Sequence, residues 1–187
     1  VELRTIETGL GNGFAIYGEG VRYDYSGQSA VSVGDLNCDG LSDLLIGAPG
    51  ADAYDVYLGG RSYVVYGKAD STLVDLSYVT GGAAPGITLI GEGTYGGVVA
   101  SVGAACDLNC DRLPDVLIGA PGTDSGTGTA YLVLGPISGT VRLSTADATL
   151  TGVVEDDAAG CAVAGVGDVD GDGTPDLAVG AYGYDYA

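Results

Sequence analysis

Three acidic segments of the chain repeat one spacing of oxygen-bearing side chains. Counted from the first aspartate of each segment, carboxylate or amide side chains stand at positions 1, 3, 5 and 9. A tight loop with this spacing turns alternate side chains inward around one ion, and a backbone carbonyl at position 7 adds a ligand. Hard oxygen donors suit Ca²⁺ and make zinc or copper a poor fit, so the sequence predicts up to three calcium ions. The predicted ligands are Asp35, Asn37, Asp39, Leu41 and Asp43; Asp107, Asn109, Asp111, Leu113 and Asp115; and Asp168, Asp170, Asp172, Thr174 and Asp176.

Position 6 of each loop distinguishes the middle site from the other two. The loop needs a sharp turn there, which Gly40 and Gly173 provide without steric cost. The middle loop has Arg112 instead, and a non-glycine residue in a left-handed conformation costs about 1 kcal/mol. A cation beside the site also opposes metal binding, so the middle site is predicted to be the weakest.

Position 12 separates these loops from EF-hands. An EF-hand needs a bidentate glutamate there and a helix on each side. The chain has Ile46, Ile118 and Val179 at this position, each within an apolar, strand-like run. The sequence therefore excludes a calcium sensor in which two helices swing apart, and a bound ion is expected to stabilise the fold.

A simpler interpretation of the same loops remains open. Aspartate, asparagine and glycine are common in turns that only connect strands. Three loops in one register, each ending in an aspartate before an apolar run, favour metal binding over plain turns.

The charge of the chain limits its partners. Its 187 residues include 25 acidic and 6 basic side chains, for a formal net charge of -19. Such a chain is not expected to bind nucleic acid or an anionic membrane through a basic surface. No apolar run approaches the roughly 18 residues that cross a bilayer, and "VELRTIETGL" at the start does not resemble a signal peptide. We expect a protein without membrane insertion, either mature or excised from a longer chain.

Catalysis is not expected. The sequence has no histidine, which removes the commonest general base and the usual serine or cysteine nucleophile machinery. Paired carboxylates can act on glycosides, but the clustered acidic residues already belong to the loops. An enzyme domain acting on polysaccharides or phosphoesters remains a less favoured alternative.

The four cysteines favour disulfides in an oxidising compartment over a zinc site, which would need further ligands. Three pairings are possible, and the sequence does not choose among them. The interpretation favoured here joins Cys106 to Cys110 and leaves Cys38 and Cys161 free or paired with each other. This chemistry indicates an extracellular or cell-surface location.

The elements that must position the loops repeat with them. The first aspartates stand at 35, 107 and 168, and steps of 72 and 61 residues indicate an array of supersecondary units. Around each loop lie short segments rich in Val, Ile, Leu, Tyr and Thr, bounded by Gly, Asp, Asn or Pro, which is typical of strands. Runs such as "DLLIG" are apolar on successive residues, as expected for inner strands between propeller blades. The sequence predicts an all-β fold of three four-stranded repeats, at 1–67, 68–135 and 136–187, with the last incomplete.

Motifs on either side of the loops carry a family resemblance. "GAPG" follows the first two loops, at 47–50 and 119–122, and "GAYG" follows the third at 180–183. The turns before the loops are "YSG" at 25–27, "YGG" at 95–97 and "AAG" at 158–160. The chain resembles the FG-GAP repeats of integrin-alpha-type β-propellers, in the form seen in secreted bacterial repeat proteins. The resemblance implies calcium loops that join the first two strands of each blade, with the ligands named above.

Two features depart from the family pattern. Arg112 occupies the turn of the middle loop, and two more residues separate Gly97 from Asp107 than separate Gly27 from Asp35. The inner strand of the second repeat is therefore expected to bulge.

Three repeats are too few to close a propeller of this family. The third repeat reaches Ala187 where the counterpart of "RSYVVYG" should begin. Either the chain is part of a larger propeller, or copies complete one another's blades head to tail and build a filament. We expect a non-enzymatic, calcium-binding extracellular module for adhesion, scaffolding or surface assembly, with an unidentified protein or carbohydrate ligand.

Overall fold

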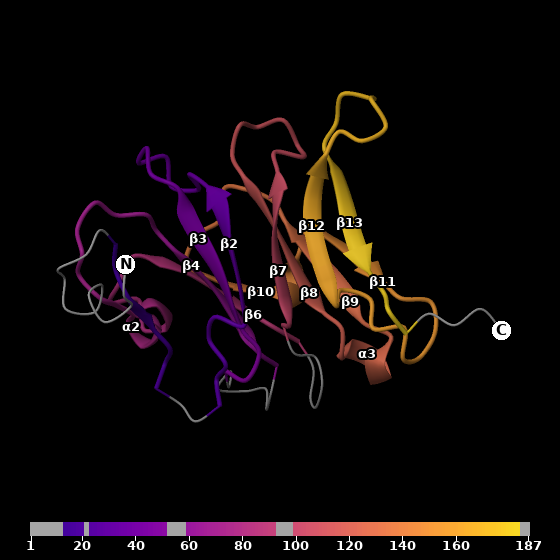
Figure 1. Cartoon of the computed structure of the whole chain (residues 1–187), viewed down its shortest axis with the longest axis horizontal. Helices are drawn as coiled ribbons and strands as arrows, with labels where there is room; N and C mark the ends of the chain where they lie inside the picture. The colour runs from indigo at the N-terminus through magenta and orange to yellow at the C-terminus, as the bar shows by residue number, and fades with distance from the viewer. Residues whose placement is uncertain (1–12, 21–22, 52–58, 93–98, 184–187) are drawn as a thin grey trace.

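A computed structural model describes residues 13–20, 23–51, 59–92 and 99–183. The described part is almost entirely β-structure, as predicted, and Figure 1 shows three sheets standing side by side. This arrangement agrees with the blades of a propeller.

The first sheet has five strands in the spatial order β10-β6-β4-β3-β2. Neighbouring strands are antiparallel except for β10, which runs parallel to β6. The strands are β2 (Ser29–Gly34), β3 (Asp43–Ala48), β4 (Arg61–Val65), β6 (Gly86–Ile90) and β10 (Thr140–Arg142). The segment 86–90 lies in the second sequence repeat but pairs with strands from residues 29–65 of the first repeat. A structural blade therefore does not coincide with a sequence repeat. The repeat limits themselves stay a prediction.

The second sheet repeats the antiparallel part of the first, in the order β11-β9-β8-β7. Its strands are β7 (Ser101–Cys106), β8 (Asp115–Ala120), β9 (Thr129–Val133) and β11 (Ala148–Thr151). The third sheet pairs β12 (Ala162–Gly167) with β13 (Asp176–Gly180). A further pair joins β1 (Ile16–Tyr17) to β5 (Val74–Asp75) in parallel.

Helices are short and peripheral in the described residues. They are α2 (Leu76–Thr80), α3 (Thr123–Gly126) and the 3-10 turn η1 (Leu143–Thr145). Asp75 caps α2, because its carboxylate accepts a hydrogen bond from the Ser77 backbone N–H. Two residues inside α3 have left-handed backbone angles, so this segment is a turn more than a helix.

Apolar side chains fill the spaces between the sheets. One cluster joins the first sheet to the second and includes Leu45, Val64 and Ile118. Another joins the second sheet to the third through Leu117 and its half-buried neighbour Val163. The strands β3 and β8 are buried on successive residues, as the apolar runs of the sequence predict.

The far face of the first sheet is covered by parts of the chain that lie outside that sheet. Tyr63 and Val65 pack there against Leu76 and Val79 of α2 and against Ile16 of β1. Figure 1 shows α2 on the side of this sheet that faces away from the second sheet. The first sheet is therefore buried on both faces.

A β-bulge precedes each acidic loop. The register shifts between Ser32 and Gly34, and corresponding shifts occur in the pairs β7–β8 and β12–β13. The bulge expected in the second repeat is therefore present, but it is common to all three repeats. Gly97, from which the two extra residues were counted, lies outside the described residues. At the bulge Cys106 adopts a φ of 64°, where the other repeats have glycine.

Candidate metal centre

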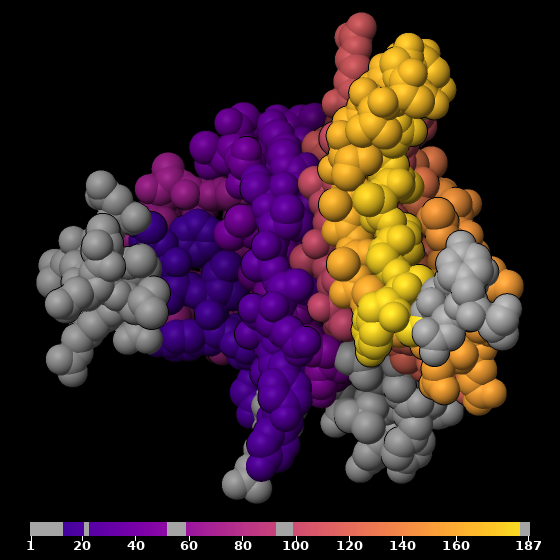
Figure 2. Space-filling view, turned by 45° about the vertical axis from the view of Figure 1, so that its right-hand side comes forward, coloured from indigo at the N-terminus to yellow at the C-terminus, as the bar shows by residue number. Residues whose placement is uncertain are grey.

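The three acidic loops lie at one end of the molecule. They connect β2 to β3, β7 to β8 and β12 to β13, and Figure 1 shows all three at the same end of their sheets. In the space-filling view of Figure 2, the loops of the second and third repeats protrude from this end. Each loop joins the two first strands of its sheet, as the family resemblance implies.

The aspartate at position 1 organises each loop. In the first loop, the two Asp35 oxygens accept hydrogen bonds from the backbone N–H groups of Asp39 at 3.0 Å and Gly40 at 2.8 Å. Asp107 and Asp168 accept the corresponding bonds from positions 5 and 6 of their own loops, at distances of 2.8 to 3.1 Å. The three loops thus share one conformation.

Positions 3 and 5 point their oxygens into the same turn. The Asn37 amide oxygen accepts from the Asp39 N–H at 3.0 Å, and Asp39 accepts from the Leu41 N–H at 2.8 Å. The same pair of bonds occurs in the other loops, where the acceptors are Asn109 and Asp111, and Asp170 and Asp172. An oxygen that accepts one hydrogen bond keeps a second lone pair for an ion.

The aspartate at position 9 ties the loop to the rest of its sheet. Asp43 is fully buried and accepts from the backbone N–H groups of Leu36 and Gly67, both at 2.8 Å. Asp115 is also fully buried and makes the equivalent bonds to Leu108 and Gly135. Burial raises the pKa of both carboxyls, while these backbone donors act in the opposite direction. Asp176 accepts from Val169.

The third loop brings its carboxylates closest to a metal-binding arrangement. One oxygen from each of Asp168, Asp170 and Asp176 lies within 4.8 Å of the others. Asparagine replaces Asp170 in the other two loops, where Asn37 and Asn109 offer amide oxygens. The chemistry of this donor set fits a divalent cation bound by oxygen. Leu41, Leu113 and Thr174, whose carbonyls were predicted as ligands, lie within the same turns as their position-5 aspartates.

Two positions of each loop have a left-handed backbone. Position 6 has φ values of 88° at Gly40, 74° at Arg112 and 93° at Gly173, as the sequence predicts. Position 4 is left-handed as well, at Cys38, Cys110 and Gly171. The sequence interpretation missed this second position, although the glycine at 171 is a signal for it.

The cysteines are not paired in the structure. All four are free thiols, and Cys38, Cys106 and Cys110 are exposed. The favoured disulfide between Cys106 and Cys110 is therefore not supported. Both residues have left-handed backbone angles that belong to the bulge and to the loop turn, so their conformation follows the loop.

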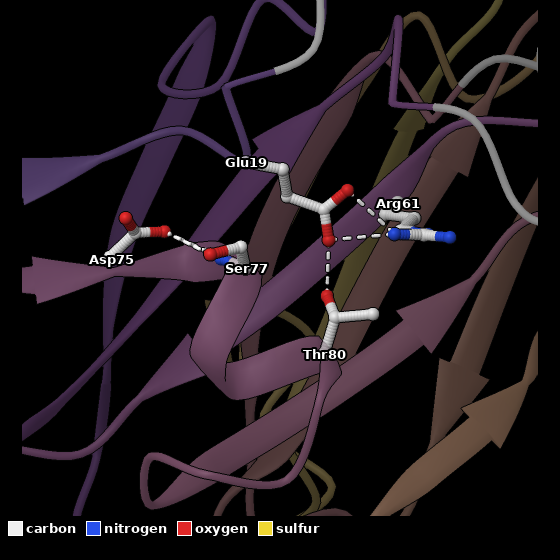
Figure 3. Close-up of polar contacts among 5 residues, drawn as sticks. All are labelled: Glu19, Arg61, Asp75, Ser77 and Thr80. Atoms are coloured by element: carbon white, nitrogen blue, oxygen red, sulfur yellow. Dashed lines mark hydrogen bonds and ion pairs between the residues drawn. The ribbon is translucent and has the colours of Figure 1, made fainter.

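A second polar cluster, also missed from the sequence, lies on the far face of the first sheet (Figure 3). The Arg61 Nη1 contacts both carboxylate oxygens of Glu19 at 2.6 Å, and the Thr80 hydroxyl donates to the same carboxylate. Both charged side chains are nearly inaccessible, at 3% and 8% exposure. Burial, together with Glu19, raises the pKa of the neighbouring Tyr63. This cluster is enclosed in the fold and offers no open site.

The signal for this cluster was a repeated tripeptide. "GEG" occurs at 18–20 and again at 91–93. In the second repeat, Glu92 accepts a long hydrogen bond of 3.4 Å from Tyr131, the counterpart of Tyr63. Burial raises the pKa of Tyr131 to about 12. In both repeats this glutamate therefore contacts the third strand of the following blade.

No helix within the described ranges is long and apolar enough to cross a membrane.

Comparisons with known proteins agree with the fold and the loops. The FG-GAP repeat model matches residues 27–65 and 162–187, which include the first and third acidic loops. Integrin alpha pat-2 of Caenorhabditis elegans is 32% identical over 163 residues, covering 84% of this chain and 13% of its own length. Human integrin alpha-IIb is 32% identical over 169 residues, covering 85% of this chain and 15% of its own.

A second group of relatives has a different name. Bovine phosphatidylinositol-glycan-specific phospholipase D is 32% identical over 160 residues, covering 81% of this chain and 18% of its own length. The chain therefore spans less than a fifth of each of these relatives. All three are animal proteins, so the secreted bacterial form expected from the sequence stays a prediction. Motifs, blades and similarities agree: the chain contains FG-GAP repeats and is homologous to integrin alpha chains.

Proposed function

We propose that the chain is a non-enzymatic, calcium-binding extracellular β-propeller module for adhesion, scaffolding or surface assembly. The observation that supports it best is one hydrogen-bonded acidic loop, repeated three times at the same end of the molecule. Each loop offers four oxygen-bearing side chains and a backbone carbonyl. Ca²⁺ takes six to eight oxygen ligands in flexible geometry, which suits such a loop better than the strict octahedron of Mg²⁺.

The ion's role in this proposal is structural. Each loop links the first two strands of a blade, and Asp43 and Asp115 extend the link to Gly67 and Gly135, each the second residue after the third strand. A bound cation would hold the side chains of positions 1, 3, 5 and 9 around one centre. It would also offset the repulsion among the 10 carboxylates that the three loops contain.

The proposed location and role rest on the relatives. Similarity to integrin alpha chains supports an adhesive or scaffolding module outside the cell. The phospholipase D relatives show that such repeats also occur in a protein named as an enzyme. For this chain, the absence of histidine and the use of the clustered aspartates in loops favour a non-enzymatic role. Filament formation stays a prediction.

Calcium dependence is the decisive test. We expect saturating CaCl₂ to raise the thermal midpoint and EDTA to lower it, because a ligand at 100 times its Kd stabilises the folded state by about 2.7 kcal/mol per site. Asp168→Asn should remove one site from a calorimetric calcium titration. The control Asp70→Asn changes an exposed aspartate outside the loops and should leave the titration unchanged. An identical midpoint in calcium and in EDTA would refute the proposal.

A further inference from the structure

A pocket beside the first acidic loop is not explained by metal binding. It has a volume of about 400 Å³ and lies among the first loop, the residues after β4, and α2. Its lining includes Tyr66, Leu73 and Tyr78. This volume lies in the range of small-molecule sites, which is about 300 to 1,000 Å³.

The apolar part of the lining provides flat aromatic surface. Tyr66 directly follows β4, and Tyr78 lies on α2 with 60% of its surface exposed. Leu73, which is 46% exposed, lines the pocket as well. Tyrosine combines a flat apolar ring with a hydroxyl that forms hydrogen bonds. Such a surface fits a ligand that has both C–H faces and hydroxyl groups.

Among the described residues, the one cation in the pocket lining is already engaged. The Lys68 ammonium group donates to the Thr72 carbonyl and hydroxyl and lies 3.1 Å from an Asp70 oxygen. It also sits 4.9 Å from the centre of the Phe14 ring. Lys68 therefore holds the turn after β4 in place and is not free to bind an anionic ligand.

Carboxylate oxygens are prominent in the remaining polar lining, which also includes Asn37 and Thr72. Asp70 accepts hydrogen bonds from Thr72, and Asp75 accepts hydrogen bonds from Ser77, in each case through the Oδ1 atom. The Oδ2 atoms can accept hydrogen bonds from a ligand. Within the described part of the chain, the carboxylates of Asp39, Asp70 and Asp75 line the pocket beside the single ammonium group of Lys68. This excess of carboxylates opposes anions, while a neutral ligand whose hydroxyl groups donate to these oxygens meets no like charge.

We propose that this pocket binds a neutral saccharide, with a sugar ring against the tyrosines and its hydroxyl groups donating to the free carboxylate oxygens. Hydroxyl donors, a flat C–H face and the absence of negative charge are the properties that the lining favours. The inference goes beyond the proposed function, because it assigns a ligand class to a pocket that adjoins the first acidic loop through Asn37 and Asp39.

The test uses the full chain and the methyl glycosides of D-glucose, D-galactose, D-mannose and N-acetyl-D-glucosamine. Saturation-transfer NMR detects binding, and tyrosine fluorescence gives its Kd, since the chain has 13 tyrosines and no tryptophan. We expect at least one glycoside to saturate. Tyr78→Ala should weaken its binding at least tenfold, and Leu73→Ala is a second, independent pocket variant. Tyr182→Ala, which removes a ring that is 83% exposed outside this pocket, should bind like the wild type.

Three results would overturn the inference. They are no saturation by any glycoside, unchanged binding in both pocket variants, and saturation only by a tetralysine peptide or by methyl glucuronide. Repeating the titration with calcium and with EDTA separates this inference from the proposed function. Sugar binding by a chain that calcium does not stabilise would remove the metal proposal alone. Calcium stabilisation without sugar binding would remove the saccharide proposal alone.

Discussion

At the scale of single residues, the loop backbone limits which side chains suit each position. Arg112 has a φ of 74° where the other loops have glycine, and this conformation costs a non-glycine residue about 1 kcal/mol. Its N–H still donates to Asp107, so the loop keeps its shape despite the cost. The FG-GAP repeat model matches the regions of the first and third loops, which have glycine at this position.

Replacing this arginine should therefore improve the middle loop. We expect Arg112→Gly to raise the free energy of unfolding by about 1 kcal/mol and to tighten calcium binding by the second loop, because a nearby cation is also removed. Urea unfolding and calorimetric titration measure the two effects. The reverse change in the first loop, Gly40→Arg, is the matched control and should have the opposite effect. Equal stability of Arg112→Gly and the wild type would contradict the argument.

At the scale of elements, the buried pair of Glu19 and Arg61 fastens one segment to another. Glu19 follows β1, Arg61 begins β4, and Thr80 ends α2, so one carboxylate joins three elements (Figure 3). A buried charge that loses its partner destabilises a fold by about 3 to 5 kcal/mol. Removing either residue would leave the other as an unpaired buried charge, and this charge is the main source of the expected loss of stability.

We expect Glu19→Ala to lower the free energy of unfolding by about 3 kcal/mol, because Arg61 would keep its charge in a buried place. The double variant Glu19→Leu with Arg61→Met should recover much of this loss, since neither side chain then carries a buried charge. Urea unfolding of the three proteins measures both effects. The more exposed pair of Lys68 and Asp70, at 20% and 65% exposure, offers a control, because Lys68→Ala should change stability far less. A double variant less stable than Glu19→Ala would show that the pair itself supplies the stability.

The elements also show what the sequence could and could not predict. The positions of the loop oxygens follow from a local spacing, and the strands follow from short apolar runs, so both could be predicted from the sequence. The bond from Gly67 to Asp43 spans 24 residues and the pair of Arg61 and Glu19 spans 42. Such contacts depend on how the sheet folds back, which no local pattern contains. The favoured pairing of Cys106 with Cys110 is not supported, because both are free thiols whose left-handed backbone belongs to the bulge and to the loop turn.

At the scale of the whole molecule, the fold gathers negatively charged side chains at one end of the sheets. The net charge of -19 is concentrated in part at one end of the sheets, where the three loops place 10 of the 25 acidic residues. Repulsion among exposed carboxylates acts over about 10 Å at 0.1 M salt and about 3 Å at 1 M salt. Without a bound cation, this end of the molecule should therefore be sensitive to ionic strength.

We expect the thermal midpoint in EDTA to rise as NaCl increases from about 0.1 M to about 1 M, because the salt screens this repulsion. With saturating calcium the rise should be smaller, since bound ions already neutralise the loops. A variant with Asp168, Asp170 and Asp172 all changed to asparagine should show a weaker salt dependence in EDTA than the wild type. Differential scanning calorimetry over the salt series measures all three. Equal salt dependence with calcium and with EDTA would show that the loop carboxylates do not limit the stability of the metal-free chain.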